Sequence, residues 1–244
     1  MILNLGWGPA ALLLLALPAL RAPRNARWIA LAIGVSIADS VATLLPLIDG
    51  RLWIAHLHYN WSGKLIDIAV MITLMLVLVT LGPFKRADFA FTLKQAPGTR
   101  RGLLMVAVPF LILIAVLTAT MFGNLKPPSL ETLLYEATLP GLAEELVWRG
   151  LLLALFDRMF SGRVTFLGAA LGYGAIATSL VFGFLHGVQF DSKLVLHTAW
   201  ENGVFAAATG LVLVWIRART KSLVFPVLTH NATNLILESV PLLT

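Results

Sequence analysis

The chain has 244 residues, of which 59% are hydrophobic and only 12% are charged, and its formal net charge is +6. A soluble domain carries about 25% charged residues, so this composition excludes a soluble enzyme, a disordered protein and a nucleic-acid-binding domain. The chain contains no cysteine, which excludes a disulfide, a thiolate metal ligand and a cysteine nucleophile. We therefore expect a polytopic membrane protein, with membrane lipid as a partner and no nucleic-acid partner.

Eight apolar segments are long enough to be membrane-spanning helices, which need about 20 mostly apolar residues. They cover residues 2–20, 28–48, 65–81, 103–122, 133–156, 167–188, 194–216 and 223–243. No soluble domain separates them, so the sequence predicts an all-α bundle of about eight transmembrane helices. We expect one folding unit, with four N-terminal helices in residues 1–126 and four more in residues 127–244.

The basic residues predict the orientation of this bundle. Thirteen lie in or beside the loops after the first, third, fifth and seventh segments: Arg21, Arg24, Arg27, Lys85, Arg86, Lys94, Arg100, Arg101, Arg158, Arg163, Arg217, Arg219 and Lys221. Only four lie in the alternate loops: Arg51, Lys64, Lys126 and Lys193. Because positive charge is retained on the cytoplasmic side, we expect both termini outside, in a bacterial inner membrane.

Ionisable residues inside apolar segments are costly, so each is a functional hypothesis whose structural alternative is an ion pair. Asp39 lies in the second segment beside Ser40, and we interpret it as protonated or hydrogen-bonded to a neighbouring helix. In the fifth segment, Glu145 and Arg149 are spaced i,i+4 and can pair on one helix face. Glu144 points about 100° away, which leaves it available as a general base. The structural alternative is a salt bridge that packs helices.

Three further groups contain histidine. His186 ends the run that begins at Phe182, and the glycines at positions 172, 174, 183 and 187 predict close approach of neighbouring helices there. His197 and Glu201 are spaced i,i+4 and predict a second buried pair near the outer surface, or a contact with substrate. The last group is His230 and Asn234, which the same spacing places on one helix face, whereas Asn231 lies on another face and is interpreted as packing or backbone capping.

Peptide hydrolysis needs an activated water and a group that stabilises the developing oxyanion. Glu144 with His186 can activate the water, and His230 with Asn234 can stabilise the oxyanion. Alternatively, Glu144, His186 and His230 can hold a zinc ion, since three protein ligands and one water form the usual catalytic zinc site. The residues leave both mechanisms open, one without a cofactor and one with Zn²⁺.

These motifs, in this order, resemble the CPBP family of intramembrane proteases, which includes type II CAAX prenyl endopeptidases and Abi or bacteriocin-immunity-type proteins. The matching pieces are Glu144-Glu145-x-x-x-Arg149, Phe182-x-x-x-His186 and His230-x-x-x-Asn234, supported by Gly150 and by the run from Ser222 to Pro226. The resemblance covers residues 133–234. It implies an eight-helix enzyme in which residues 127–244 carry the catalytic helices.

By the resemblance, Glu144 and His186 activate the water, His230 and Asn234 form the oxyanion site, and Glu145 and Arg149 orient them. Members of the family are described both as metalloproteases and as glutamic-type proteases, so the resemblance also leaves the metal open. The predicted orientation puts Glu144 and His186 in the extracytoplasmic half of the membrane. We therefore expect an endopeptidase acting on a membrane-anchored peptide or protein tail at that face. The alternatives are a CAAX prenyl protease and a non-catalytic immunity or scaffold protein.

Overall fold

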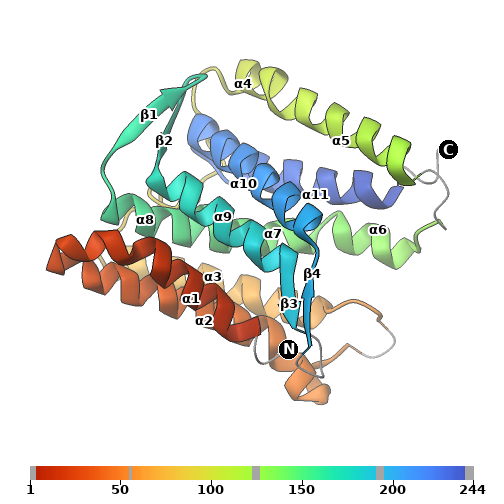
Figure 1. The fold of residues 1–244 in the computed structure, drawn as a ribbon, viewed down its shortest axis with the longest axis horizontal. Helices are drawn as coiled ribbons and strands as arrows, with labels where there is room; N and C mark the ends of the chain where they lie inside the picture. The colour runs from red at the N-terminus through yellow and green to blue at the C-terminus, as the bar shows by residue number, and fades with distance from the viewer. Residues whose placement is uncertain (1–3, 55–56, 123–126, 191–194, 240–244) are drawn as a thin grey trace.

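The part of the chain that the structure describes forms eight helical rods, several of them interrupted, and Figure 1 shows these rods packed side by side as a bundle. The computed structural model describes residues 4–54, 57–122, 127–190 and 195–239. Its helices are α1 (Asn4–Ala16), α2 (Ala26–Ile48), α3 (Trp61–Thr80), α4 (Thr99–Met105), α5 (Ala107–Phe122), α6 (Leu130–Glu136), α7 (Leu139–Glu145), the π-helix η4 (Leu146–Leu152), α8 (Leu153–Met159), α9 (Tyr173–Gly187), α10 (Trp200–Thr220) and α11 (Val224–Ser239). Short 3-10 helices are η1 (Leu17–Arg21), η2 (Pro23–Asn25) and η3 (Gly50–Leu52).

The outward faces of the rods are apolar, as a lipid environment requires. Leu14, Ile112 and Val204 are 67%, 59% and 70% exposed. Among the described residues, four helices are long and apolar enough to cross a membrane: Pro23–Ile48, Trp61–Thr80, Thr99–Thr120 and Trp200–Thr220. Trp7–Arg21 and Tyr173–Gly187 are shorter apolar helices. The all-α membrane fold is confirmed, and the chain is an integral membrane protein.

Two antiparallel hairpins replace the ends of predicted helices. The strands β1 (Arg163–Phe166) and β2 (Ala169–Gly172) pair with each other, and β3 (Val188–Phe190) pairs with β4 (Leu196–Thr198). The prediction of a helix from residue 167 was wrong, because Leu167 and Gly168 have φ angles of 47° and 78° and form the two-residue turn between β1 and β2. Such a turn requires positive φ at both positions and matches the twist of a hairpin. The helix begins instead at Tyr173.

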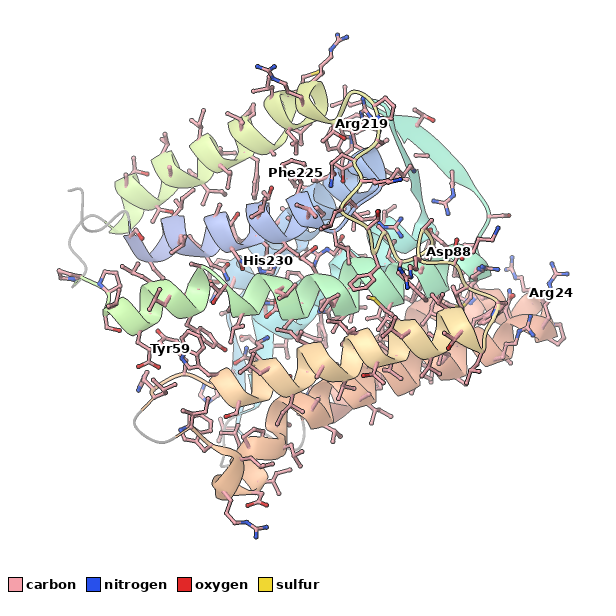
Figure 2. The ribbon with its side chains drawn as sticks, turned by 180° about the vertical axis from the view of Figure 1, so that it is seen from behind. Arg24, Tyr59, Asp88, Arg219, Phe225 and His230 are labelled. Atoms are coloured by element: carbon pink, nitrogen blue, oxygen red, sulfur yellow. The ribbon has the colours of Figure 1, made fainter. Side chains whose placement is uncertain are left out.

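The four predicted basic loops meet at one end of the bundle. The Arg158 guanidinium, after α8, donates to Asp88 Oδ2 at 2.8 Å in the loop after α3. Arg219, at the end of α10, donates to the Pro97 carbonyl at 2.9 Å in that same loop. Figure 2 shows Arg24, Asp88 and Arg219 at this end and Tyr59 at the opposite end. Lys126 and Lys193, two of the four residues assigned to the alternate loops, lie outside the described residues.

Helices α9 and α10 approach each other through glycine, as predicted. A Cβ on Gly183 would lie 2.4 Å from the Gly203 carbonyl oxygen, and one on Gly187 would lie 2.9 Å from the Gly203 Cα. Gly174 approaches the Phe156 Cβ in the same way, whereas Gly172 lies in β2. The close contact between α9 and α10 fixes the position of the last turn of α9, where His186 lies.

We expect Gly183→Ala to lower the melting temperature of the detergent-purified protein. The added methyl group overpacks a contact between two backbones, at a cost of about 1–3 kcal/mol. Gly34→Ala is the matched control, since a Cβ at Gly34 in α2 meets nothing within 4 Å. The control should be neutral or slightly stabilised by its better helix propensity. Equal melting temperatures for both variants would contradict the tight packing of α9 on α10.

Candidate active site

The Glu144-Glu145 pair lies where a long helical rod changes its hydrogen-bonding pattern. The rod is interrupted before α7, and Asn231 of α11 caps the new start: its Oδ1 accepts from the Gly141 N–H at 2.9 Å and its Nδ2 donates to the Thr138 carbonyl at 3.2 Å. The predicted backbone-capping role of Asn231 is thus confirmed. After Glu145 the rod continues as the π-helix η4. Single π turns often lie at functional sites.

Glu145 bonds to two partners in the interior. Its Oε1 accepts from the Arg149 guanidinium at 2.9 Å and from His230 Nδ1 at 2.8 Å. The side chains of Glu145 and Arg149 are 0% and 1% exposed. The predicted i,i+4 pair is therefore present, and it also connects η4 to α11 through the imidazole.

Glu144 points to another face of the rod, as its position in the helix predicts, and meets a cation there. Its Oε1 accepts from Lys64 Nζ at 2.9 Å, and its Oε2 lies 3.8 Å from His230 Nε2. The placement of Lys64 in a loop was wrong, because Asn60 caps α3 through the Gly63 N–H and starts that helix four residues earlier than predicted. This cap brings Lys64 into the first turn of α3, against α7.

The Phe182 ring is the contact point of the two histidines and the arginine. The Arg149 guanidinium lies 4.6 Å from its centroid, and the rings of His186 and His230 lie 4.3 and 6.1 Å from it, centroid to centroid. His186 Nδ1 is 2.8 Å from the Phe182 carbonyl. A carbonyl only accepts, so Nδ1 carries the proton and Nε2 of the neutral ring has the free lone pair.

The predicted residues line two neighbouring cavities of about 340 and 330 Å³. Glu144 lines the first and His230 and Asn234 the second, while His186 and Gln189 line both. The Asn234 amide nitrogen donates to Glu136 Oε2 at 2.9 Å. An amide has two N–H groups, so this bond leaves the second one available. The structure thus brings Glu144, His186, His230 and Asn234 to two cavities that share a wall at His186 and Gln189.

Two acidic residues from the N-terminal half complete the polar interior. Asp39 of α2 lines the first cavity beside Lys64, and Asp67 follows Lys64 by one turn and is 1% exposed. Asp39 was predicted to be a lone acid, and Asp67 was not predicted to be part of the site. An acidic residue inside an apolar segment was the available signal for Asp67.

His197 and Glu201 lie elsewhere. The prediction that one helix carries both was wrong, because His197 lies in β4 and Glu201 in the first turn of α10. Both are exposed, and neither contributes to the lining of the two cavities. Because β4 precedes it, α10 begins only at Trp200, six residues after the predicted start. That predicted start, residue 194, lies outside the described residues.

Glu131 fixes the start of α3 relative to α6. Its Oε1 accepts from the backbone N–H groups of Tyr59 and His58 at 3.0 and 2.8 Å and from the Trp61 indole at 3.2 Å. These bonds, that of Tyr59 foremost, hold the pKa of the Glu131 carboxyl below its ordinary value. The ionised carboxylate therefore helps to place Lys64 next to α7.

The arrangement does not suit a divalent metal ion. Among the described residues, no group of three or more His, Cys, Asp or Glu side chains could hold one. The Nδ1 bonds of His186 and His230 leave both Nε2 atoms free, but the Lys64 ammonium occupies one oxygen of Glu144. A zinc ion bound by Glu144, His186 and His230 would stand beside the Lys64 cation, which repels it.

Comparison with protein families decides the relationship of the C-terminal half. Residues 124–236 match the family model described as type II CAAX prenyl endopeptidase Rce1-like. The match of this region, called the Rce1-like domain below, supports a CPBP-family intramembrane protease. All three motifs of the resemblance lie within the Rce1-like domain, whereas Asp39, Lys64 and Asp67 lie outside it. The match supports an intramembrane endopeptidase that acts on a peptide or protein. Comparisons with curated proteins and with solved structures give no match.

We expect Arg149→Met to destabilise the protein strongly. Removal of one partner from a buried ion pair leaves an uncompensated charge and costs about 3–5 kcal/mol, here on Glu145. Arg158→Met is the matched control, because its ion pair with Asp88 is about one third exposed on both sides and such pairs contribute about 1 kcal/mol or less. Denaturant unfolding in detergent measures both variants. A loss for Arg149→Met no larger than for Arg158→Met would contradict the structural importance of the buried pair.

Proposed function

We propose that the protein is an intramembrane endopeptidase that hydrolyses a peptide bond in a membrane-anchored peptide or protein tail, with a water activated by Glu144 and His186. The observation that carries this proposal is the separation of 3.8 Å between Glu144 Oε2 and His230 Nε2. This separation exceeds a hydrogen bond and leaves Oε2 of Glu144 and Nε2 of His230 unbonded to each other beside the two cavities. A single water at the side of the pair is within hydrogen-bond distance of both atoms.

Glu144 is the general base of the proposed reaction. Its Oε2 takes a proton from water while Lys64 keeps Oε1 occupied. His186 Nε2, which carries the free lone pair, accepts a hydrogen bond from the same water and orients it. The water oxygen then bonds to the carbonyl carbon of the substrate. Collapse of the tetrahedral intermediate breaks the C–N bond, and Glu144 passes its proton to the leaving amine.

His230 and Asn234 stabilise the developing oxyanion. His230 Nδ1 is bonded to Glu145, so the ring meets the oxyanion through Nε2, which donates when the ring is protonated. Asn234 adds its second amide N–H from the same cavity wall. Donors fixed before the reaction begins stabilise such an oxyanion most strongly. Glu145 and Arg149 act through His230, which they orient.

The extracytoplasmic face is the proposed side of cleavage. The basic loops gather at one end of the bundle, and the cavities are lined by Gln189 of β3 at the other end (Figure 1). If the basic end is cytoplasmic, Glu144 and His186 are reached from outside. This geometry supports a substrate whose scissile bond lies near the outer membrane surface.

The second candidate function is a CAAX prenyl endopeptidase. The description of the matching family favours it directly. A prenylated tail is presented from the cytosol, so this function requires the opposite orientation of the bundle. Orientation and substrate therefore separate the two candidates.

We expect Glu144→Gln to abolish hydrolysis by the detergent-purified protein and leave its melting temperature close to that of the wild type. The amide retains the shape of the side chain but removes the base, whose contribution to the rate is about 10² to 10⁴-fold.

The assay compares an unprenylated membrane-anchored peptide with a farnesylated CAAX peptide. Cleavage of the farnesylated peptide alone would favour the second candidate. Equal activity of wild type and variant would count against both and favour a scaffold or immunity protein. Activity lost to a chelator together with stoichiometric zinc would contradict the metal-free mechanism.

We expect single cysteines to report the orientation, since the wild-type chain contains none. Gly50→Cys and Gly162→Cys lie at opposite ends of the bundle. They form a matched pair because a Cβ at either position meets nothing within 4 Å. In intact cells, a membrane-impermeant thiol reagent should label Cys at position 50 directly. It should label Cys at position 162, beside β1 at the basic end, only after permeabilisation. The reverse pattern would place the cavities on the cytoplasmic side.

A further inference from the structure

We infer that Lys64 is a positioning residue for Glu144, supplied to the Rce1-like domain by the N-terminal half of the chain. Its ammonium holds Oε1 of the carboxylate, keeps the group ionised in apolar surroundings and leaves Oε2 directed at His230. The inference deepens the proposed function and rests on Glu144 as its base. Lys64 lies outside residues 124–236, so the family match assigns nothing to it.

The contact between Lys64 and Glu144 is short and protected from water. The ammonium lies 2.9 Å from Oε1, and the two side chains are 16% and 21% exposed. A surface ion pair contributes little, because water and salt screen it. Here most of that water is excluded, so the attraction between the charges is stronger than at a surface.

Neighbouring helices hold the lysine in place. Asn60 caps the turn of α3 that carries it, and Glu131 ties the residues just before that turn to α6. A Cβ on Gly150 would lie 2.3 Å from Met75 Cε, which shows how closely η4 and α3 pack. The Lys64 ammonium therefore reaches Glu144 from a fixed direction.

Charged and titratable groups surround the pair on every side. Those facing it are Asp39 on α2, Lys64 and Asp67 on α3, Tyr135 and Glu136 on α6, Glu145 on α7, Arg149 on η4, His186 on α9 and His230 on α11. Arg149 is already bonded to Glu145, and His230 Nε2 lies 3.8 Å from Glu144 Oε2. Lys64 is thus the cation at hydrogen-bond distance from Glu144 within the described residues.

The chemical consequence concerns the base itself. A carboxylate without a nearby cation in an apolar interior takes up a proton, and a protonated carboxyl group cannot accept the proton of water. With Lys64 bonded to Oε1, the Oε2 atom of Glu144 keeps a free lone pair that can accept a proton. Loss of the ammonium should therefore change when Glu144 ionises, and should lower turnover without weakening substrate binding.

The first test measures the ionisation of Glu144 by infrared pH titration of the detergent-purified protein. Each spectrum is corrected by that of the same protein carrying Glu144→Gln, so that the remaining carboxylate band belongs to Glu144. In Lys64→Gln the band should convert to the protonated form at a pH about one unit or more above that of the wild type. Lys64→Arg should titrate like the wild type. Unchanged titration of Lys64→Gln overturns the inference, whatever the outcome for peptidase activity.

The second test uses turnover on a peptide that the wild type cleaves. Lys64→Gln should lose about tenfold to a hundredfold in kcat, a fraction of what a general base contributes, with KM unchanged and the acid limb of the pH profile moved to higher pH. Lys64→Arg should recover most of that loss. Lys94→Gln is the matched control, since Lys94 is exposed in the basic loop, and its kinetics should equal the wild type. A change in KM alone, or an unmoved pH profile, overturns the inference.

A chemical rescue provides a second variant in case Lys64→Gln folds poorly. In Lys64→Cys the new cysteine is the only one in the chain. Alkylation of its thiolate by 2-bromoethylamine forms a C–S bond, releases bromide and recreates an ammonium at the same reach as lysine. Alkylation by bromoethane gives the same thioether without the charge. Rescue of kcat and of the Glu144 titration by the charged reagent alone supports the inference, and equal results with both reagents overturn it.

Discussion

A carboxylate in an apolar interior is stable only beside a cation or hydrogen-bond donors, and Glu145 meets this requirement with Arg149 and His230 together. Because one oxygen holds both partners, the rod that contains η4, the α11 helix and the imidazole ring are fixed by a single group. The bond from His230 Nδ1 to Glu145 also orients the ring so that its Nε2 faces Glu144. The geometry of the cavities thus depends on a pair that does not line them.

The Rce1-like domain contains the three motifs, but the cation that is bonded to Glu144 comes from outside it. Glu145 finds Arg149 within the domain, whereas Glu144 finds Lys64 eighty residues earlier in the chain. The N-terminal helices α2 and α3 therefore contribute to the electrostatics of the cavities as well as to the membrane fold. Beside the cavities, the matched and unmatched parts of the chain meet at the Lys64–Glu144 ion pair.

Regular helical spacing made much of the site predictable. The Glu145–Arg149 pair, the separate direction of Glu144 and the shared face of His230 and Asn234 all follow from 3.6 residues per turn. Contacts across the bundle did not follow, because no local pattern in the sequence connects Lys64 with Glu144. Two errors had local causes: the Leu167-Gly168 turn within an apolar run concealed a hairpin, and the Asn60 cap was overlooked as a helix start. Hydropathy locates apolar segments well and their first turns poorly.

The π turn after Glu145 has a consequence for changes in chain length. In η4 the Leu153 N–H donates to the Trp148 carbonyl five residues earlier, so this stretch carries one residue more than a regular α-helix of the same rise. Deletion of one residue here can restore regular α-helical bonding without breaking the rod. Because the wider π turn takes up the extra residue, such a deletion would leave Glu144 and Glu145 facing the same direction relative to α8. A one-residue gap in this stretch among related sequences would therefore mark a regular helix that keeps Glu144 and Glu145 in place and changes only the side chains within the turn, Arg149 among them.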